Sequence, residues 1–343
     1  MASTRFIIET LPIADSRVQQ AWKSIENASP GLSPFMRYDF QMVVARDLGI
    51  KRFAGYTASA LCAVDDRREI SAILPVVTRR SDGSVRLLGD IKGCGINDLL
   101  VAPDLGDTEK AEVAEAIVMT FLSLAHNNRW KLRRLPADSL LRSIDTGAAE
   151  TVTGCAAINI SCGDALWLKG LSKSVRQNLR TAYNRLSRNG ADITLEKYMP
   201  GDDPEIYRQA LSLYCRRQAE AYTDGNVLTR AAHRLKLLHS RQSKALGTLP
   251  FALTLLLKIR EKPAACMTGL LSADGETYAV PRLAIDPEFL FFSPGYILIS
   301  EAVRYFAMSG GPKVIDLSRG NERYKTDLGG VPYHTYDLRA ARK

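Results

Sequence analysis

The sequence lacks any run of about 18 uncharged apolar residues, which is the length that a membrane-spanning helix needs. Its first residues, 1–6, lack the pattern of a secretory signal and lead directly into a strand-like segment. These two features predict a cytoplasmic protein, either free or peripheral to the inner membrane.

Cysteine and histidine are scarce, with six cysteines and four histidines in 343 residues. They form no Cys-x-x-Cys pair and no His/Cys cluster at zinc spacing, and His233 and His239 are too far apart for a metal pair on one helix face. The cysteines stand mostly in apolar surroundings. We therefore expect buried free thiols in a reducing compartment, and no metal.

Basic residues outnumber acidic ones, 46 to 37, which gives a formal net charge of +9. This balance favours anionic partners, such as a phosphate-rich cofactor, an anionic membrane surface or nucleic acid. Charge alone does not choose among these partners. The hydrophobic content, 46%, is that of an ordinary globular protein.

Two parts of the chain show the same order of predicted elements: two helices, three strands, a loop with proline, a helix and a strand. In the first part these are helices 15–26 and 35–45, strands 58–64, 70–77 and 85–88, helix 107–126 and strand 130–135. In the second part they are helices 205–218 and 229–240, strands 251–259, 264–271 and 277–284, a helix ending near Met308 and strand 314–317. Chance is the alternative, because three-strand meanders followed by a helix are common. The shared order predicts two copies of one α+β unit, residues 1–150 and 151–343.

Residues 151–200 form a crossover between these parts, and it contains a strongly basic helix over 171–188. Ser172 is the predicted N-cap of this helix, and Gly190 ends it. Apolar residues recur on one face, which indicates a packed helix with a solvated basic face. The cations are Lys173, Arg176, Arg180, Arg185 and Arg188. The same cations would suit an anionic carrier, a lipid surface or a tRNA.

The long helices of the two parts begin differently. The second begins at Ser293-Pro294-Gly295-Tyr296-Ile297, where serine suits a cap, proline suits the first turn and no acid is near. The first begins with Asp107 and Glu109, which would occupy the free N–H groups and repel phosphate. We therefore expect a phosphate-bearing cofactor only at 293–297. A plain helix-start turn is the alternative reading.

The run 313–325 changes from a short apolar strand into a loop of charged residues. Asp316 ends the buried part, and Arg319, Glu322, Tyr324 and Lys325 follow around Gly320. A strand that opens into such a loop is a common place for chemistry, because the strand fixes the loop while the loop stays accessible. A solvated strand exit is the alternative.

These motifs resemble the GCN5-related N-acetyltransferase (GNAT) superfamily. More narrowly, the chain resembles its CelD/BcsL-like group of cellulose-biosynthesis-type acetyltransferases, which is related to the FemABX peptidyltransferases. The most specific match is Asp316 to Lys325, close to the family's Asp-x-x-x-Gly-x-Glu-x-Tyr-Lys. Weaker matches occur in the right order at Ser33-Pro34-Phe35, 73–76, 87–89 with Asn97-Asp98, 171–180 and 293–295. The resemblance implies an α+β fold of tandem GNAT-like domains, each a mixed sheet flanked by helices.

The resemblance also implies the activity: an N-acyltransferase that moves an acyl group from acyl-CoA, acetyl-CoA or longer, to an amine. The acceptor would be a small molecule, an envelope lipid or a polysaccharide precursor, bound in a cleft between the halves. The acyl-CoA site would lie in the second half. A FemABX-like aminoacyl transfer from charged tRNA is the first alternative, less expected than acyl-CoA. A non-catalytic double domain that serves as a binding subunit is the second, and no DNA partner is expected.

Each candidate residue receives a role from this resemblance and from its residue type. Asp316 is the first candidate for the base that accepts the amine proton, and Glu322 the second. Tyr278 and Tyr324 are candidate acids for the leaving thiolate, and Lys325 is the cation for donor phosphates or the oxyanion. The cofactor site would comprise Ser293, Gly295, Tyr296, Ile297, Arg282, Arg319 and Tyr324, and the acceptor site Asn97 and Asp98. For Asn97 and Asp98, a structural glycine-rich turn is the alternative.

Overall fold

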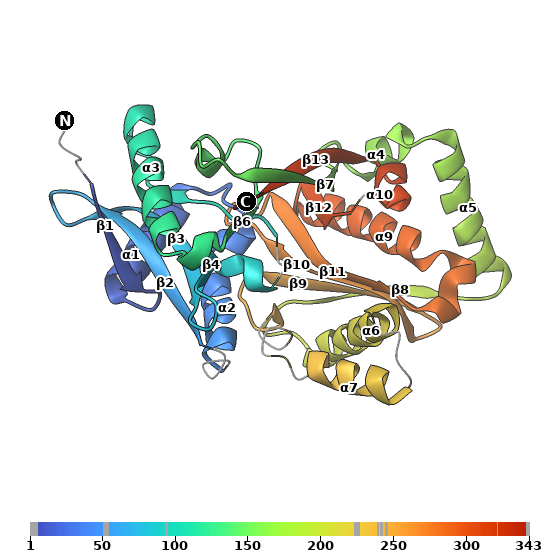
Figure 1. The fold of residues 1–343 in the computed structure, drawn as a ribbon. Coiled ribbons are helices and arrows are strands. Elements are labelled where there is room, and N and C mark those ends of the chain that lie inside the picture. The colour runs from blue at the N-terminus through green and yellow to red at the C-terminus, as the bar shows by residue number, and fades with distance from the viewer. Residues whose placement is uncertain are drawn as a thin grey trace. The chain divides into compact units, whose positions relative to one another are not determined.

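The chain forms two compact units in a computed structural model that describes residues 6–50, 55–92, 95–222, 227–238, 240, 243, 246–320 and 322–340. The N-terminal unit comprises Met1–Gly154 with His334–Lys343, and the C-terminal unit comprises Cys155–Tyr333. Each unit is a mixed sheet flanked by helices (Figure 1), so the predicted α+β fold class is confirmed.

The sheet of the N-terminal unit has the strand order β1-β2-β3-β4-β6-β13, and β5 pairs with β3. Its strands are β1 (Ile7–Pro12), β2 (Tyr56–Val64), β3 (Ile70–Arg79), β4 (Ser84–Leu87), β5 (Leu100–Val101), β6 (Trp130–Leu135) and β13 (Gly330–Arg339). Its helices are α1 (Ser16–Ala28), α2 (Tyr38–Ile50) and α3 (Asp107–Ser123), with short 3₁₀ turns at Pro34–Met36, Leu88–Lys92, His126–Asn128 and Leu140–Arg142. Val113, Ile117 and Phe121 of α3 are fully buried against this sheet.

The sheet of the C-terminal unit has the order β8-β9-β10-β11-β12-β7. Its strands are β7 (Ala149–Asn159), β8 (Ile193–Tyr198), β9 (Ala252–Ile259), β10 (Lys262–Leu271), β11 (Thr277–Ile285) and β12 (Val314–Arg319). Its helices are α4 (Asp164–Gly170), α5 (Lys173–Arg188), α6 (Pro204–Tyr222), α7 (Val227–Leu238), α9 (Pro294–Ser309) and α10 (Arg323–Asp327), and a 3₁₀ helix, η6, spans Pro287–Phe292.

The two faces of this second sheet carry different helices. Residues of α5 and α9 join one large core on one face, while α6 packs on the other face and carries α7 (Figure 1). Because side chains alternate along a strand, each residue of β11 belongs to one of these two faces. This division decides below which predicted site residues can act together.

Both sheets have the same sequence of pairings. In each sheet the first three neighbouring pairs are antiparallel, the fourth is parallel and the fifth is antiparallel. The parallel pair is β4 with β6 in the N-terminal unit and β11 with β12 in the C-terminal unit. The shared element order predicted for the two halves is therefore confirmed. The sequence pattern did not indicate that the last part of β13, from His334 on, belongs to the N-terminal unit.

Several local expectations differ from the structure. The predicted helix 35–45 is divided, because Arg37 is extended (ψ 141°) between the 3₁₀ turn and α2. The helices α4 and α10 and the strand β13 were not predicted. Cys62, Cys155, Cys215 and Cys266 are buried as expected, whereas Cys162 is exposed and Cys94 lies outside the described residues. Within the described residues, the structure has no helix long and apolar enough to span a membrane.

Candidate functional site

The parallel strands β11 and β12 diverge in the middle of the C-terminal sheet. Their pairing covers Thr277↔Val314, Tyr278↔Ile315 and Ala279↔Asp316, although β11 continues to Ile285. On its other edge, β11 pairs Ala279 with Leu270 but Arg282 with Thr268, so that three steps on β11 match two on β10. This β-bulge bends β11 at the point where its pairing with β12 ends. Among the described residues, no pair between β11 and β12 follows Ala279 and Asp316.

Asp316 lies at the end of the paired part of β12. The next residues turn sharply, because Ser318 has a left-handed backbone (φ 56°), and its N–H donates to Asp316 Oδ1 at 2.8 Å. The pairing of β12 with β7 also shifts between Asp316 and Arg319. The bond from Ser318 therefore fixes the carboxyl group of Asp316 at the residue where the pairing of β11 with β12 ends.

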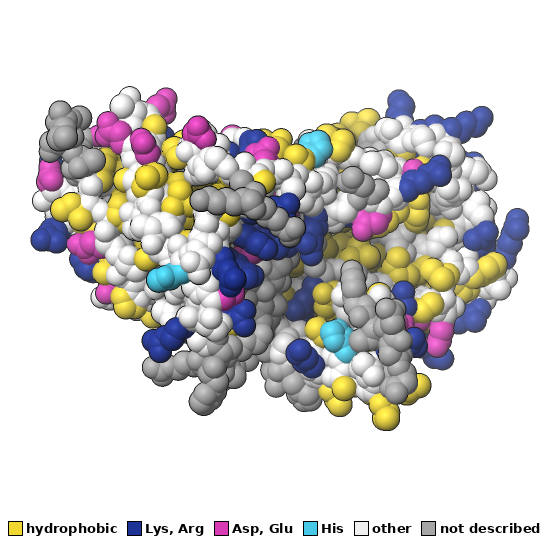
Figure 2. All heavy atoms as spheres, viewed as in Figure 1, with side chains coloured by type: hydrophobic (Ala, Val, Ile, Leu, Met, Phe, Trp, Pro, Cys, Tyr) yellow, Lys and Arg dark blue, Asp and Glu magenta, His cyan; other side chains and the backbone are white. Residues whose placement is uncertain are grey.

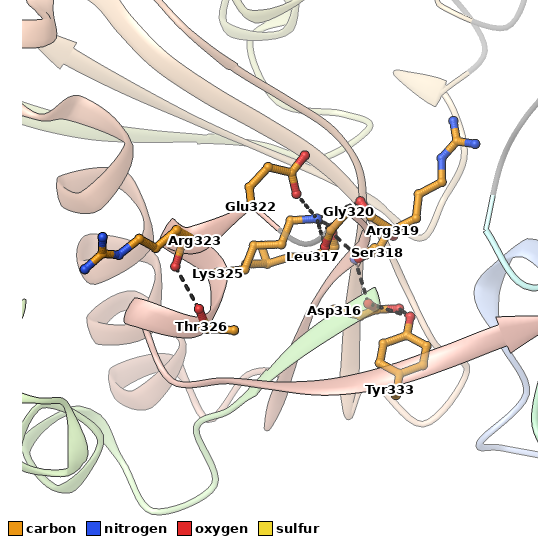
Figure 3. A network of polar contacts seen from close by, with 10 residues as sticks. All are labelled: Asp316, Leu317, Ser318, Arg319, Gly320, Glu322, Arg323, Lys325, Thr326 and Tyr333. Carbon is orange, nitrogen blue, oxygen red and sulfur yellow. Dashed lines mark hydrogen bonds and ion pairs between the residues drawn. The ribbon is translucent and has the colours of Figure 1, made fainter. Parts of the chain in front are cut away.

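The hydroxyl of Tyr333 on β13 lies 2.9 Å from both carboxyl oxygens of Asp316 and donates to them (Figure 3). Burial raises the pKa of the Asp316 carboxyl, and the bonds from Ser318 and Tyr333 and the charge of Lys325 lower it only in part. Burial and the negative Asp316 raise the pKa of Tyr333, so its hydroxyl stays a proton donor. A buried carboxyl with a raised pKa is a better proton acceptor near neutral pH than an exposed one.

Lys325 is 3% exposed and holds the loop together (Figure 3). Its ammonium donates to four main-chain carbonyls, those of Leu317 at 3.0 Å, Ser318 at 3.3 Å, Arg319 at 2.7 Å and Gly320 at 3.4 Å. It also forms an ion pair with Glu322 at 3.1 Å. An ammonium has three hydrogens, and these five acceptors already use them. The geometry therefore gives Lys325 a positioning role, in place of the contact with donor phosphate that the motif implied.

The N-terminus of α9 lies at the end of the divergent part of β11, beyond η6. Ser293 is the N-cap residue, but it is in the left-handed conformation (φ 55°) and its side chain makes no capping bond, so the expectation that its hydroxyl caps the helix is wrong. The first turn, all of which is described, holds no acidic residue. A Cβ on Gly295 would approach Ile285 Cδ1 to 2.6 Å, so glycine lets the helix start pack closely against β11.

The corresponding helix of the N-terminal unit, α3, has an occupied start. The Glu109 carboxylate accepts from the N–H of the N-cap residue Gly106 at 2.9 Å, and Asp107 adds a second negative charge. The predicted difference between the two helix starts is confirmed in this respect. Of these two helices, α9 is the one whose first turn has no negative side chain.

Two residues predicted for the cofactor site contribute to structure around α9. Ile297 is fully buried in the core, so only its main chain can face a ligand. Tyr296 donates from its hydroxyl to Asp327 at 2.9 Å, and burial together with Asp327 raises the pKa of this phenol to about 12. This bond joins α9 to α10.

The two candidate thiolate acids have different surroundings. Tyr278 is fully buried, and its hydroxyl donates to the carbonyl of Leu253 at 2.9 Å inside the core, out of reach of a leaving group. Tyr324 is partly buried, and burial with the neighbouring Glu322 raises its pKa to about 12. Of the two, only Tyr324 belongs to the charged loop.

The two arginines predicted for the cofactor site, Arg282 and Arg319, do not lie together. Arg319 is exposed and its side chain points away from Asp316 (Figure 3). Arg282 faces the α6 side of the sheet, where it donates to Ser243 Oγ at 3.2 Å and lies 4.9 Å from the ring of Tyr214. Because α9 covers the opposite face, Arg282 does not join the helix start that was predicted to bind phosphate.

Asn97 and Asp98 lie in the N-terminal unit, where their side chains bond to protein groups. Asn97 is 2% exposed and donates to the carbonyl of Arg133 at 3.4 Å. Asp98 accepts from Ser139 Oγ at 2.6 Å and from the N–H of Leu99 at 2.8 Å. Burial raises the pKa of Asp98 to about 6. Their role in acceptor binding stays a prediction.

The structure thus gathers Asp316, Glu322 and Lys325 around one loop, and it adds Tyr333, which the sequence reading missed. Residues 330–339 contain Val331, Tyr333, Thr335 and Tyr336, residue types that strands favour, and this signal was present in the sequence. Among the described residues, no group of three or more His, Cys, Asp or Glu side chains is placed to hold a metal ion.

Residues 173–326 match the family model described as an acetyltransferase (GNAT) domain. This part of the chain is similar to a GNAT domain, which confirms the resemblance to the GNAT superfamily for residues 173–326. A search of curated proteins finds no match.

Solved structures with similar folds cover most of the chain. A C-terminal domain assigned to a lysylphosphatidylglycerol synthetase from Agrobacterium fabrum has 11% identity and a TM-score of 0.54, over 94% of this chain and 93% of that one. L-PGS from Bacillus licheniformis has 12% identity and a TM-score of 0.51, over 83% and 85%. FemX has 10% identity and a TM-score of 0.50, over 87% and 91%. At these identities the likeness shows the fold alone.

Replacing the buried lysine, Lys325→Met, should reduce the free energy of unfolding by on the order of 3 kcal/mol, because the loop carbonyls and Glu322 lose their donor. Chemical denaturation measures this loss. The control is Lys313→Met, because Lys313 is 58% exposed and pairs with Glu276 at 2.8 Å. It should cost less than about 1 kcal/mol. Equal effects of the two substitutions would contradict the positioning role of Lys325.

The raised pKa of Asp98, about 6 against an ordinary 3.8, makes the folded state bind this proton more tightly than the unfolded state. The free energy of unfolding should therefore fall as pH rises from about 4 to 6, and the penalty should persist above that window. Asp98→Asn keeps an acceptor oxygen for Leu99 and Ser139. It should be more stable than wild type at pH 7.5, by on the order of 2 kcal/mol.

Denaturant midpoints of wild type and Asp98→Asn, measured across pH 4–8, compare the stabilities of the two proteins. The difference between the two proteins should disappear at pH 4, where the wild-type carboxyl is protonated. A constant difference at every pH would mean that the substitution acts through packing and not through the charge of Asp98.

Proposed function

We propose that this protein is an N-acyltransferase that takes its acyl group from acyl-CoA and delivers it to an amine. The observation that carries this proposal is the start of α9, free of acidic residues in its first turn and seated by Gly295 at the end of the divergent part of β11. The match to a GNAT domain supports acyl transfer in general. The identity of the donor, acyl-CoA, and of the acceptor, an amine, is what we propose.

The donor would extend along the opening between β11 and β12. Its pyrophosphate would bind main-chain N–H groups at 293–297, where the helix dipole favours negative charge. Its thioester would lie near Ala279 and Asp316, where the pairing of the two strands ends. Main-chain N–H groups on the freed edge of β11 would polarise the thioester carbonyl.

In the transfer step, the amine nitrogen bonds to the thioester carbon while Asp316 accepts the amine proton, directly or through the Tyr333 hydroxyl. Through Tyr333, the phenol gives its proton to Asp316 and receives the amine proton in the same step. The carbon–sulfur bond then breaks and the CoA thiolate leaves, to be protonated by water or by Tyr324. Lys325 acts indirectly, because it fixes the main chain of 317–320 beside the reacting groups.

The donor site is tested with two substitutions at one position. Gly295→Ala and Gly295→Asp both bring a Cβ against Ile285, but only the second adds a negative charge. Calorimetry with CoA should show that Gly295→Asp binds at least tenfold more weakly than Gly295→Ala, because the carboxylate opposes the phosphates. Equal affinity of two variants that melt alike would remove the pyrophosphate from this helix start.

Catalysis by Asp316 is tested by release of free thiol from acetyl-CoA with a panel of primary amines. Asp316→Asn should lower kcat by about 10²-fold or more with little change in CoA affinity. Tyr333→Phe removes a hydrogen bond that lowers the pKa of Asp316. The acid limb of its kcat profile should therefore move to higher pH. A fully active Asp316→Asn variant would transfer the role of base to Glu322.

A second candidate is FemABX-like aminoacyl transfer from charged tRNA, which the basic helix α5 favours. Its cations include the exposed Lys173 and Arg180, whereas Arg176 donates to the carbonyls of Lys169 and Leu171. Binding to tRNA would weaken steeply with salt and be lost in Lys173→Glu/Arg180→Glu. We expect no specific tRNA binding at physiological salt. Filter binding over a salt series decides, and salt-sensitive binding lost in this variant would favour the tRNA donor.

A further inference from the structure

Helix α7, Val227–Leu238, exposes the apolar side chains that a surface helix usually buries. Val227 is 79% exposed, Leu228 77% and Leu235 55%, and none of the residues of α7 is buried. At 100° per residue these three side chains and the exposed Ala231 form one stripe, about 100° wide. Figure 2 shows hydrophobic side chains projecting over this helix.

The stripe on α7 has a cation on each side and no acid within the helix. By the same helical rotation, Arg230 lies beside one edge of the stripe and Lys236 beyond the other. Helix α7 packs on α6, and Arg234, which lies about 20° outside the edge of the stripe by the same rotation, donates to Ser212 Oγ at 3.1 Å. Val227, Leu228 and Leu235 nevertheless stay exposed beside this contact.

Helix α5 is also basic and free of acids, but its apolar face points into the core and not toward solvent. Its apolar residues Val175, Leu179, Ala182 and Leu186 are buried in the core, so its surface is polar and cationic. A helix such as α5 suits phosphate in water, whereas α7 presents apolar and cationic groups together. That combination is typical of helices that lie in the interface of a membrane.

We propose that α7 docks this protein onto an anionic lipid bilayer. The apolar stripe would enter the boundary between headgroups and acyl chains, while Arg230 and Lys236 bind the anionic headgroups beside it. A bilayer fits better than nucleic acid, because the stripe consists of aliphatic side chains that neither stack on bases nor bond to phosphate. The proposal does not depend on which acyl donor the protein uses.

A cavity lies beside α7, next to the surface that we propose to face the bilayer. It has a volume of about 460 Å³, and its lining includes Arg234 of α7 with Arg208, Gln209 and Arg216 of α6. Arg234 Nε and Gln209 Oε1 are buried there without a hydrogen-bond partner among the described residues. The cavity therefore has polar groups of both charges next to α7, whereas these two atoms are themselves covered by protein.

The test is co-sedimentation of the full chain with vesicles of phosphatidylcholine alone and of phosphatidylcholine with 30% phosphatidylglycerol, at about 0.15 M salt. Wild-type protein should bind the vesicles that contain phosphatidylglycerol at least tenfold more tightly than vesicles of phosphatidylcholine alone. Leu228→Ser/Leu235→Ser should weaken that binding by about tenfold or more, because two apolar side chains no longer enter the interface. Arg230→Gln/Lys236→Gln should weaken it by a similar factor.

The matched control is Leu290→Ser/Phe291→Ser on η6, where both side chains are exposed, by 61% and 57%. It should bind vesicles like wild type, and all variants should keep the wild-type melting temperature. Absence of vesicle binding, or equal loss in the control, would overturn the proposal. So would a wild-type dimer in solution that Leu228→Ser/Leu235→Ser dissociates, or tRNA binding that needs Arg230 and Lys236 but not the leucines.

Discussion

The arrangement of the candidate site depends on one constraint: main-chain pairing between β11 and β12 stops at Ala279 and Asp316. The bulge in β11 and the left-handed Ser318 turn each strand away from the other at this point. Unpaired strand edges inside a sheet are costly unless something else satisfies them. An extended ligand with its own carbonyl and amide groups can do so, which supports the proposal that the donor binds at this defect in the ladder.

Near the end of this pairing, some polar side chains position the loop, and one carboxyl group is positioned by them. Lys325 lies among main-chain carbonyls and fixes the loop, and Tyr333 and Ser318 fix the carboxyl of Asp316. Asp316 itself is left buried, with burial raising its pKa. A protein gains little stability from such a carboxyl, so its presence beside the opening supports a chemical role.

The two units keep one topology but differ at the start of the long helix. Both contain the same parallel pair and a long helix after it, yet Glu109 bonds to the N-cap N–H of α3, while α9 starts without an acid. A single carboxylate in the first turn is enough to make a helix start unfavourable for phosphate. The same fold therefore gives different surfaces for anions in its two copies.

The sequence by itself determined the element order, the α+β class, the contrast between the two helix starts and the loop that holds Asp316 and Lys325, because these depend on local patterns of apolar residues, caps and charge. Only the tertiary structure decided that Tyr333 lies against Asp316, that Lys325 faces carbonyls, and that Arg282 and α9 lie on opposite faces of β11. It also decided that the apolar stripe of α7 faces outward while that of α5 faces inward. Periodicity gives the width of such a stripe, but the direction it faces is set by residues distant in the chain, which no local pattern contains.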